Sequence, residues 1–175
     1  MKPMPAAQSA GQYLTFFLSE EEYGVDILRV REIIAYGTVT RVPQTPDFVR
    51  GMINHRGTAV PVLDLGAKLG LPRSDVTPRT CILLIEVPGG EGVDLLGVVA
   101  DDVHQVVEYA PGDIAPPPSF GTVVRPDGLL GLGKMGAKFV LLLDLDRVLD
   151  SPASYAPAPS RAAPVASALQ GGEER

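Results

Sequence analysis

Short apolar segments recur along the whole chain and are separated by clusters of Gly, Pro and charged residues. Because many of these segments are rich in β-branched and aromatic residues, they are typical of short β-strands. Residues 30–34 fit either a strand or one helical turn, and residues 66–70 fit a short helix or turn that ends at Gly70. We expect strands at residues 13–18, 23–27, 81–87, 95–100 and 139–145, with turns at 19–22 and 88–92.

Residues 48–65 have the pattern of two strands that meet at a tight turn. Asn54, Arg56 and Gly57 supply the turn, since Asn and Gly adopt positive φ at little cost. The unusual feature is a cation, Arg56, at the tip of a hairpin between apolar strands. Most charges at such tips only face solvent. A rigid scaffold can nevertheless use a hairpin tip for contacts, so Arg56 is a candidate contact residue.

The two halves of the chain carry the same plan twice, with matched positions that are 73 residues apart early in each half and 80 residues apart later. The spacing changes across Pro-rich loops, where insertions are tolerated, so duplication explains the matches better than chance. About five short strands per half suit a small closed barrel, which leaves no exposed sheet edge. The matches are Gly24, Val30, Ile33 and Ile34 with Gly97, Val103, Val106 and Val107, and Gly51, Val60, Leu63, Asp64, Leu65 and Leu69 with Gly131, Val140, Leu143, Asp144, Leu145 and Leu149.

Composition restricts the function. The chain of 175 residues suits one ordinary domain, and its net charge of −6 argues against nucleic acid binding, which normally uses a basic face. A single cysteine, Cys81, forms no internal disulfide, and its apolar neighbours favour a buried thiol. No stretch resembles a signal peptide or a membrane span, so we expect a cytoplasmic protein without membrane insertion. The Ala-, Pro- and Ser-rich residues 151–175 are expected to be disordered.

Catalytic chemistry needs converging titratable groups, and the sequence shows none. His55 and His104 lie in turn-like and strand-like surroundings without a nucleophile motif. Asp101 and Asp102 are adjacent, so on a strand their side chains point to opposite faces. The glycines of residues 131–136 have the spacing of a dinucleotide-binding loop, but they precede a strand rather than a helix. We therefore expect no cofactor and no metal ion.

Charged and apolar residues of the first half form a candidate contact surface. Glu32 and Arg56 are the natural ion pair, beside the apolar Val30. An exposed pair contributes only about 0–1 kcal/mol to the free energy of unfolding, but at an interface rim it sets register and partner choice. A groove lined by Val30 and Val98 would accept the apolar face of a helix.

Several segments of the chain, taken in order, resemble the CheW chemotaxis coupling proteins. The resemblance implies an all-β fold of two intertwined, five-stranded SH3-like barrels with short helical turns and no catalysis. It places a CheW-like domain over residues 12–150, whose half-barrels span roughly 12–80 and 81–150 and can exchange chain. The segments that carry the resemblance are residues 22–33, 39–43, 46–57, 60–65, 96–103 and 131–149.

Members of that family bridge the cytoplasmic tip of methyl-accepting chemoreceptors to the regulatory domain of the histidine kinase CheA in receptor arrays. The resemblance implies the same partners here. The family motif usually has Leu where this chain has His55, and an imidazole there can carry charge or stack on a partner, which bears on receptor choice. By position, the resemblance ties the receptor contact to Val30, Glu32, Gly51, Arg56 and Gly57, with the kinase contact near Val39, Thr40 and Val42.

Three other interpretations stay open. The chain can be an adaptor of a chemosensory pathway that does not serve motility, which the sequence does not distinguish. A small-barrel enzyme using His55, Asp64 or Cys81 is a second alternative, although no group that would orient a base is visible. A fragment of a larger signalling protein is the third. Because the chain starts at Met1 and carries no receiver or kinase domain, we favour a stand-alone adaptor.

Overall fold

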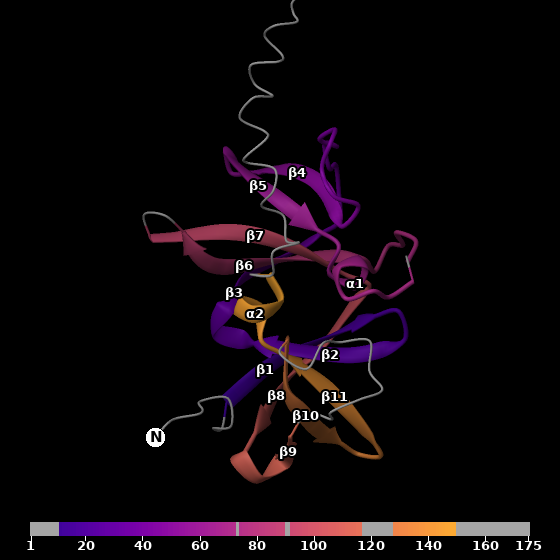
Figure 1. Cartoon of the computed structure of the whole chain (residues 1–175), viewed down its shortest axis with the longest axis vertical. Coiled ribbons are helices and arrows are strands. Elements are labelled where there is room, and N and C mark those ends of the chain that lie inside the picture. Colours follow the sequence, from indigo (N-terminus) through magenta and orange to yellow (C-terminus); the bar gives the residue numbers. More distant parts are fainter. Residues whose placement is uncertain (1–10, 73, 90–91, 117–127, 150–175) are drawn as a thin grey trace, which may run out of the picture.

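The computed structural model describes residues 11–72, 74–89, 92–116 and 128–149, and this part of the chain is built mainly from β-strands (Figure 1). The expected disordered tail, residues 151–175, lies outside the described residues. Residues 30–34, left open above, belong to a strand. The strands are β1 (Gly11–Leu18), β2 (Glu21–Asp26), β3 (Val30–Ala35), β4 (Val49–His55), β5 (Thr58–Leu63), β6 (Cys81–Gly89), β7 (Gly92–Ala100), β8 (Asp102–Tyr109), β9 (Ile114–Ala115), β10 (Leu129–Met135) and β11 (Lys138–Leu143), and the helices are α1 (Leu65–Lys68) and α2 (Leu145–Leu149).

Each of the two sheets contains strands from both halves of the chain. Sheet A has the order β8-β1-β2-β11-β10-β9, and sheet B has the order β3-β6-β7-β5-β4. The sheets are stacked along the long axis of the molecule, with α2 between them (Figure 1). The predicted all-β fold of two intertwined small barrels is confirmed. Residues 12–80 and 81–150 are thus sequence repeats, and neither range alone supplies all the strands of one sheet.

Two short parallel pairings join the halves, one in each sheet. Gly24 and Gly97, which match in the repeat, lie at the equivalent place of each pairing. A Cβ atom on Gly24 would lie 2.9 Å from Leu142 Cδ2, and one on Gly97 would lie 2.9 Å from Ile82 Cγ2. The sequence repeat is therefore also a repeat of strand register. The paired residues are Tyr23–Leu141 and Gly24–Leu142 in sheet A, and Val62–Gly97 and Leu63–Val98 in sheet B.

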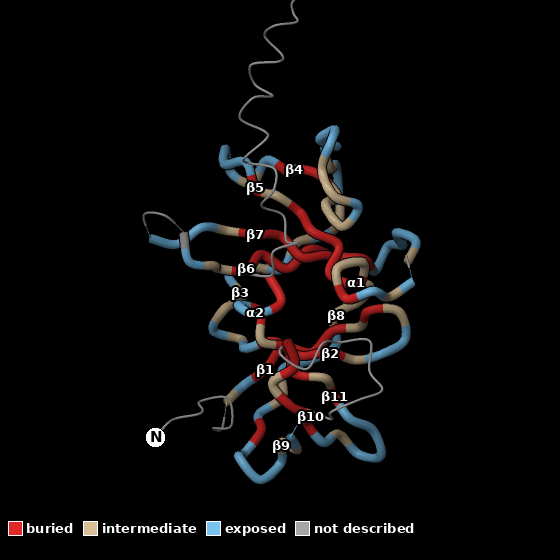
Figure 2. The backbone as a smooth tube through the Cα atoms, in the orientation of Figure 1, coloured by how far each residue is buried: buried red, intermediate tan, exposed pale blue. Residues whose placement is uncertain are grey.

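Buried apolar side chains form three clusters, and Figure 2 shows that the buried segments run through both sheets. The largest lies between the sheets and takes residues from both sheets and both helices. A second cluster, around Val60 and Val62, fills sheet B, and a third, around Val140 and Leu142, fills sheet A. Because these residues match in the repeat, each barrel has the same core plan, and the cluster between the sheets holds the barrels together.

The matched aspartates begin the two helices. Asp64 Oδ1 accepts a hydrogen bond from Ala67 N at 3.0 Å, and Asp144 Oδ1 accepts one from Arg147 N at 3.3 Å. Side-chain caps of this kind satisfy backbone N–H groups that a helix start leaves unpaired. Neither helix of the described residues has the length or apolar character that a membrane crossing requires.

Two expected turns are shorter than the sequence suggested. Pro88 pairs with Val93 and Gly89 with Gly92, so these residues extend β6 and β7. Pro88 has no backbone N–H, but it is tolerated in β6. The other neighbour of β6 is β3, whose pairing with β6 ends at Ile85, so no strand faces Pro88 on that side. In the first hairpin, Glu21 already belongs to β2.

Gly51 marks a place where the fold itself requires glycine. It is buried, its φ is +143°, and a Cβ atom there would collide with the carbonyl oxygen of Thr40. Next to Gly51, Thr40 and Met52 exchange two backbone hydrogen bonds, each 2.8 Å long. Gly51, which the family resemblance ties to the receptor contact, therefore holds the segment around Thr40 against β4.

We expect Gly51→Ala to lower the free energy of unfolding by about 3 kcal/mol, since it adds both a collision and a disfavoured backbone conformation. Chemical denaturation measures the change. Gly112→Ala is the control, because nothing lies within 4 Å of a Cβ atom at that exposed glycine. Equal unfolding midpoints for the two variants would contradict the assignment.

Candidate functional site

The hairpin of β4 and β5 ends in a two-residue turn that exposes Arg56. Both turn residues have left-handed backbone conformations, with φ of +54° at Arg56 and +85° at Gly57, as in the type I′ turns that suit hairpins. Asn54 remains in β4, paired with Ala59, and its Oδ1 accepts a hydrogen bond from Gly57 N at 2.8 Å. The positive φ therefore falls on Arg56 rather than on Asn54, whose side chain supports the turn instead.

Glu32 of β3 lies between two side chains of this hairpin, those of Arg56 and His55. Glu32 Oε2 is 3.1 Å from Arg56 Nη2, and Glu32 Oε1 is 3.3 Å from His55 Nε2. We call Glu32, His55 and Arg56 the ion cluster. The ion pair expected between Glu32 and Arg56 is thus present, with His55 as a further partner. The side chain of Arg56 is 74% exposed and that of His55 only 13%, so Arg56 is the member that a partner would meet.

The ion cluster also shows how sheet B closes. β3 and β4 are the two edge strands of sheet B in the pairing order. Glu32 from one edge nevertheless contacts His55 at the end of the other. The sheet must therefore curl until its edges meet, as in a barrel. The cluster lies on this seam, where it joins two edges that share no ladder hydrogen bonds within the described residues.

At the equivalent seam of sheet A, the residues that match the ion cluster are uncharged. Gln105 Nε2 of β8 approaches Met135 Sδ of β10 at 3.9 Å. The same barrel geometry is thus built from a neutral contact, so closure does not require the ion cluster. The charges make the tip of sheet B a specialised surface. The residues that match Glu32, His55 and Arg56 in the repeat are Gln105, Met135 and Gly136.

The expected groove lined by Val30 and Val98 is not open. Val98 is 1% exposed and belongs to the cluster between the sheets, and Val30 packs partly against the same cluster. β7, which carries Val98, is the central strand of sheet B, with β6 and β5 on either side. The prediction that Val98 contacts a partner is wrong for this arrangement, whereas Val30 keeps part of its surface beside Glu32.

The residues expected at the kinase contact lie at the outer edge of sheet B. Thr40 forms an isolated bridge with Met52 of β4 and so extends the sheet beyond that strand. Thr40 and Val42 are exposed, Val42 by 38%, while Val39 packs partly against the core of sheet B. This edge combines an exposed apolar side chain with backbone groups near the end of a sheet, which suits contact with another protein.

A second charged group at the base of the hairpin was not visible from the sequence. Arg50 Nε and Nη2 donate to Asp64 Oδ2 at 3.1 and 3.0 Å, and Arg50 Nη1 donates to Tyr36 Oη at 3.0 Å. Burial lowers the pKa of Arg50, but the hydrogen bond and charge of Asp64 raise it more, so its net pKa shift is upward. Arg50 sits at a β-bulge between Val49 and Gly51, a feature with no clear sequence signal.

The groups of the enzymatic alternative lie far apart. His55 is at the tip of the hairpin, paired with Thr58, and Asp64 follows the opposite end of β5. At the rise of an extended strand, this separation is about 20 Å. The Asp64 carboxylate is already bonded to Arg50 and to the start of α1. Cys81 is buried, and burial followed by nearby aspartate charges raises the pKa of its thiol to about 11, which disfavours the thiolate.

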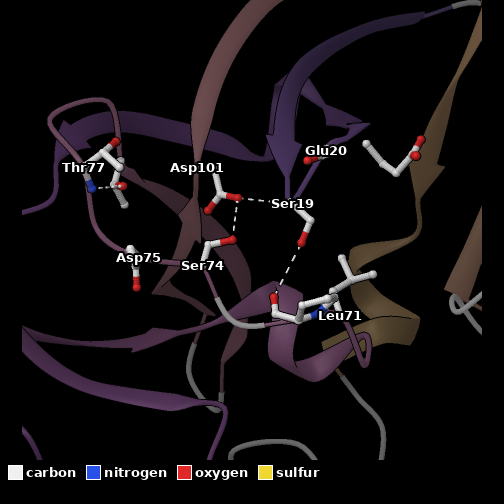
Figure 3. A pocket seen from close by; sticks show the side chains of 10 residues that line it. Ser19, Glu20, Leu71, Ser74, Asp75, Thr77 and Asp101 are labelled. Atoms are coloured by element: carbon white, nitrogen blue, oxygen red, sulfur yellow. Dashed lines mark hydrogen bonds between the residues drawn. The ribbon is translucent and has the colours of Figure 1, made fainter.

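A hollow of about 670 Å³ lies at the seam between the sheets (Figure 3). Within it, Asp101 Oδ2 accepts hydrogen bonds from Ser19 N at 2.7 Å and from Ser74 Oγ at 2.8 Å. No histidine is among its described lining residues, so Ser74 lacks the imidazole base of a serine–histidine–aspartate triad there. The described ranges also hold no group of three or more side chains placed to bind a metal ion. Asp101 ties together the turn after β1 and the loop before β6.

Taken together, these features define a class of protein. Two intertwined barrels present an exposed ion cluster at one tip and the exposed residues Thr40 and Val42 next to β4. The candidate catalytic residues of the described chain do not converge. Such a molecule is a binding scaffold.

Comparison with known proteins identifies the family. The family model of the CheW-like domain matches residues 12–153. Chemotaxis protein CheW of Klebsiella aerogenes is 36% identical over 147 residues, which cover 83% of this chain and 86% of that protein. Protein FrzA of Myxococcus xanthus is 33% identical over 126 residues, with coverage of 72% and 76%. The crystal structure of the scaffolding protein TtCheW from Thermoanaerobacter tengcongensis matches with a TM-score of 0.73 and 29% identity, over 83% of this chain and 96% of that one.

The chain therefore belongs to the CheW-like family. It is a chemotaxis adaptor that acts as a scaffold.

We expect Asp64→Ala to cost about 3–5 kcal/mol of unfolding free energy, because it removes a helix cap and leaves the buried Arg50 guanidinium without its carboxylate. Asp144→Ala is the matched control from the repeat. Asp144 caps α2 and meets the more exposed Arg147, so its loss should cost only about 1 kcal/mol. Thermal or denaturant unfolding compares the two, and equal losses would contradict the role given to Arg50.

Proposed function

We propose that this chain couples the cytoplasmic tip of methyl-accepting chemoreceptors to the regulatory domain of a CheA-type histidine kinase, without catalysing a reaction. The observation that carries the proposal is the ion cluster, whose charges occur in one of two repeated barrels and whose Arg56 is 74% exposed. Membership of a family of chemotaxis adaptors supports the proposal that the partner at this surface is a chemoreceptor. The chain would act in the cytoplasm, at receptor arrays near the inner membrane.

The receptor contact that we propose is centred on Arg56. A guanidinium has five N–H donors, and Glu32 occupies only the Nη2 side of this one. Arg56 can therefore donate further hydrogen bonds to carboxylate or carbonyl oxygens of a receptor helix while Glu32 offsets its charge. Val30, two residues before Glu32 on β3, is partly buried and would add apolar contact area, and the left-handed turn at Gly57 keeps the tip narrow.

His55 gives Glu32 a second partner on its buried side. Because Glu32 also contacts His55, the Glu32 carboxylate keeps a partner when Arg56 turns toward a receptor. This arrangement supports a role for His55 in receptor choice, acting through Glu32 rather than by direct contact.

The kinase contact that we propose lies at Thr40 and Val42. Both residues are exposed at the edge of sheet B, next to β4, and the hairpin of β4 and β5 carries Arg56 at its tip. One rigid element therefore positions both contacts. A receptor and a kinase bound to this sheet would hold a fixed geometry relative to each other, which is what coupling requires.

We expect Arg56→Glu to weaken capture of a purified receptor cytoplasmic fragment by at least about tenfold, because it places two carboxylates together and removes the donor that faces the partner. Binding of the kinase regulatory domain should be unchanged. Pull-down or titration with each partner measures both. Lys134→Glu is the control, since it makes the same charge change on the exposed hairpin of sheet A.

Two further variants sharpen this test. Val42→Glu should show the reverse pattern, with loss of the kinase domain and normal receptor binding. The charge swap Glu32→Arg with Arg56→Glu restores the pair but not the cation at the tip, so it should remain defective. Normal receptor binding by Arg56→Glu would contradict the receptor assignment. Normal binding by the charge-swapped variant would show that the ion cluster only stabilises the hairpin and does not contact the receptor.

A further inference from the structure

Sheet A carries a groove that neither proposed contact uses. It has a volume of about 400 Å³ and is lined in part by residues of β2 and β11, so we call it the β2–β11 groove. The two strands are labelled in Figure 1. The two strands pair, within the described residues, only at Tyr23–Leu141 and Gly24–Leu142. The groove lies next to that pairing, because Leu141 takes part in the pairing and also lines the groove. Its apolar lining is Phe17, Leu132, Phe139 and Leu141, and its charged lining is Glu20, Glu21, Glu22 and Lys138.

Phe139 is the most informative residue of the groove. Its side chain is 49% exposed, although it lies within a strand of a well-packed barrel. The residue that matches it in the repeat is Ala59, so the same hairpin is built in sheet B without an aromatic ring. The fold therefore does not account for Phe139. A large exposed apolar side chain in a hollow, rimmed by charged residues, is typical of a contact site.

The ring of Phe17 packs against His104, which in turn contacts Glu22. The ring centre of Phe17 is 5.6 Å from that of His104, and His104 Nδ1 lies 2.6 Å from Glu22 Oε2. Glu22 and His104 thus join β2 to β8 across β1 and fix the aromatic wall of the groove. A preformed wall of this kind lowers the entropy cost of binding a peptide.

The charge at the groove is unbalanced. Glu20 and Glu21 are exposed and form no ion pair within the described residues, whereas Lys138 is the single cation of the described lining. Two unpaired carboxylates beside an aromatic hollow favour an incoming segment with the opposite charge. They would attract it over several ångströms and fix its register.

We propose that the β2–β11 groove binds a basic peptide segment of a partner protein. An apolar side chain of that segment packs against Phe139 and Phe17, and its Lys or Arg residues face Glu20 and Glu21. Because the groove is on sheet A, whereas the ion cluster and Val42 are on sheet B, this attachment is a third one and does not depend on the receptor or kinase assignments.

The test uses the full chain and a short synthetic peptide with a Leu-Phe anchor flanked by lysines, followed by fluorescence anisotropy. Its matched partner replaces every lysine by glutamate. We expect the lysine peptide to bind more tightly, and its affinity to fall as salt is added. Phe139→Ala should weaken its binding by about tenfold. Glu20→Gln with Glu21→Gln should also weaken it and should flatten the salt dependence.

Val106→Ala is the control, because Val106 is 50% exposed on β8 of the same sheet and outside the groove lining. It should bind the lysine peptide as the unchanged chain does. Equal affinity for the lysine and glutamate peptides, or full binding by both groove variants, would overturn the proposal. Self-association that Phe139→Ala abolishes would also overturn it, by making a second copy the occupant.

Discussion

The fold of this molecule depends on two parallel strand pairings, each of which requires a glycine. At Gly24 and Gly97 a neighbouring side chain fills the space that a Cβ atom would take, so β2 meets β11 and β7 meets β5 closely. Parallel neighbours need a long connection between them. Here the connection from β2 to β11 passes through sheet B and returns, whereas the connection from β5 to β7 runs through α1 and through β6 of the same sheet. Both pairings join strands of different halves, so each half of the chain completes the other half's barrel. The barrels are intertwined because of this exchange, and the buried cluster between them belongs to both.

The exchange also assembles the proposed site. It places β3, β4 and β5 of the first half in one sheet around β6 and β7 of the second, with β3 and β4 at its edges. When that sheet curls, Glu32 meets the hairpin tip and the ion cluster forms on the seam. Duplication supplied two seams, and the ion cluster of sheet B is matched by the uncharged Gln105, Met135 and Gly136 in sheet A. A repeated fold can thus keep one copy for structure and develop the other as a contact surface.

The sequence supported the local features and the repeat. Strand positions, the hairpin tip at Arg56, its pairing with Glu32 and the equivalence of Asp64 with Asp144 follow from spacing and turn chemistry. Properties that depend on pairing between distant strands could not be predicted in this way. Val98 is buried because β7 is a central strand, Arg50 reaches Asp64 because of a bulge, and Phe139 faces a groove because of its register. An apolar residue in a strand predicts burial, and only the sheet order shows which face it occupies.

The central claim is that neither half of the chain can build a barrel alone. Its most direct test is to prepare residues 1–80 and 81–175 separately and record amide NMR spectra of each fragment and of their mixture. We expect poorly dispersed spectra from both fragments, and the dispersed spectrum of a folded β-protein after mixing, since each sheet needs strands from both. A well-dispersed spectrum from either fragment as a monomer would contradict the account.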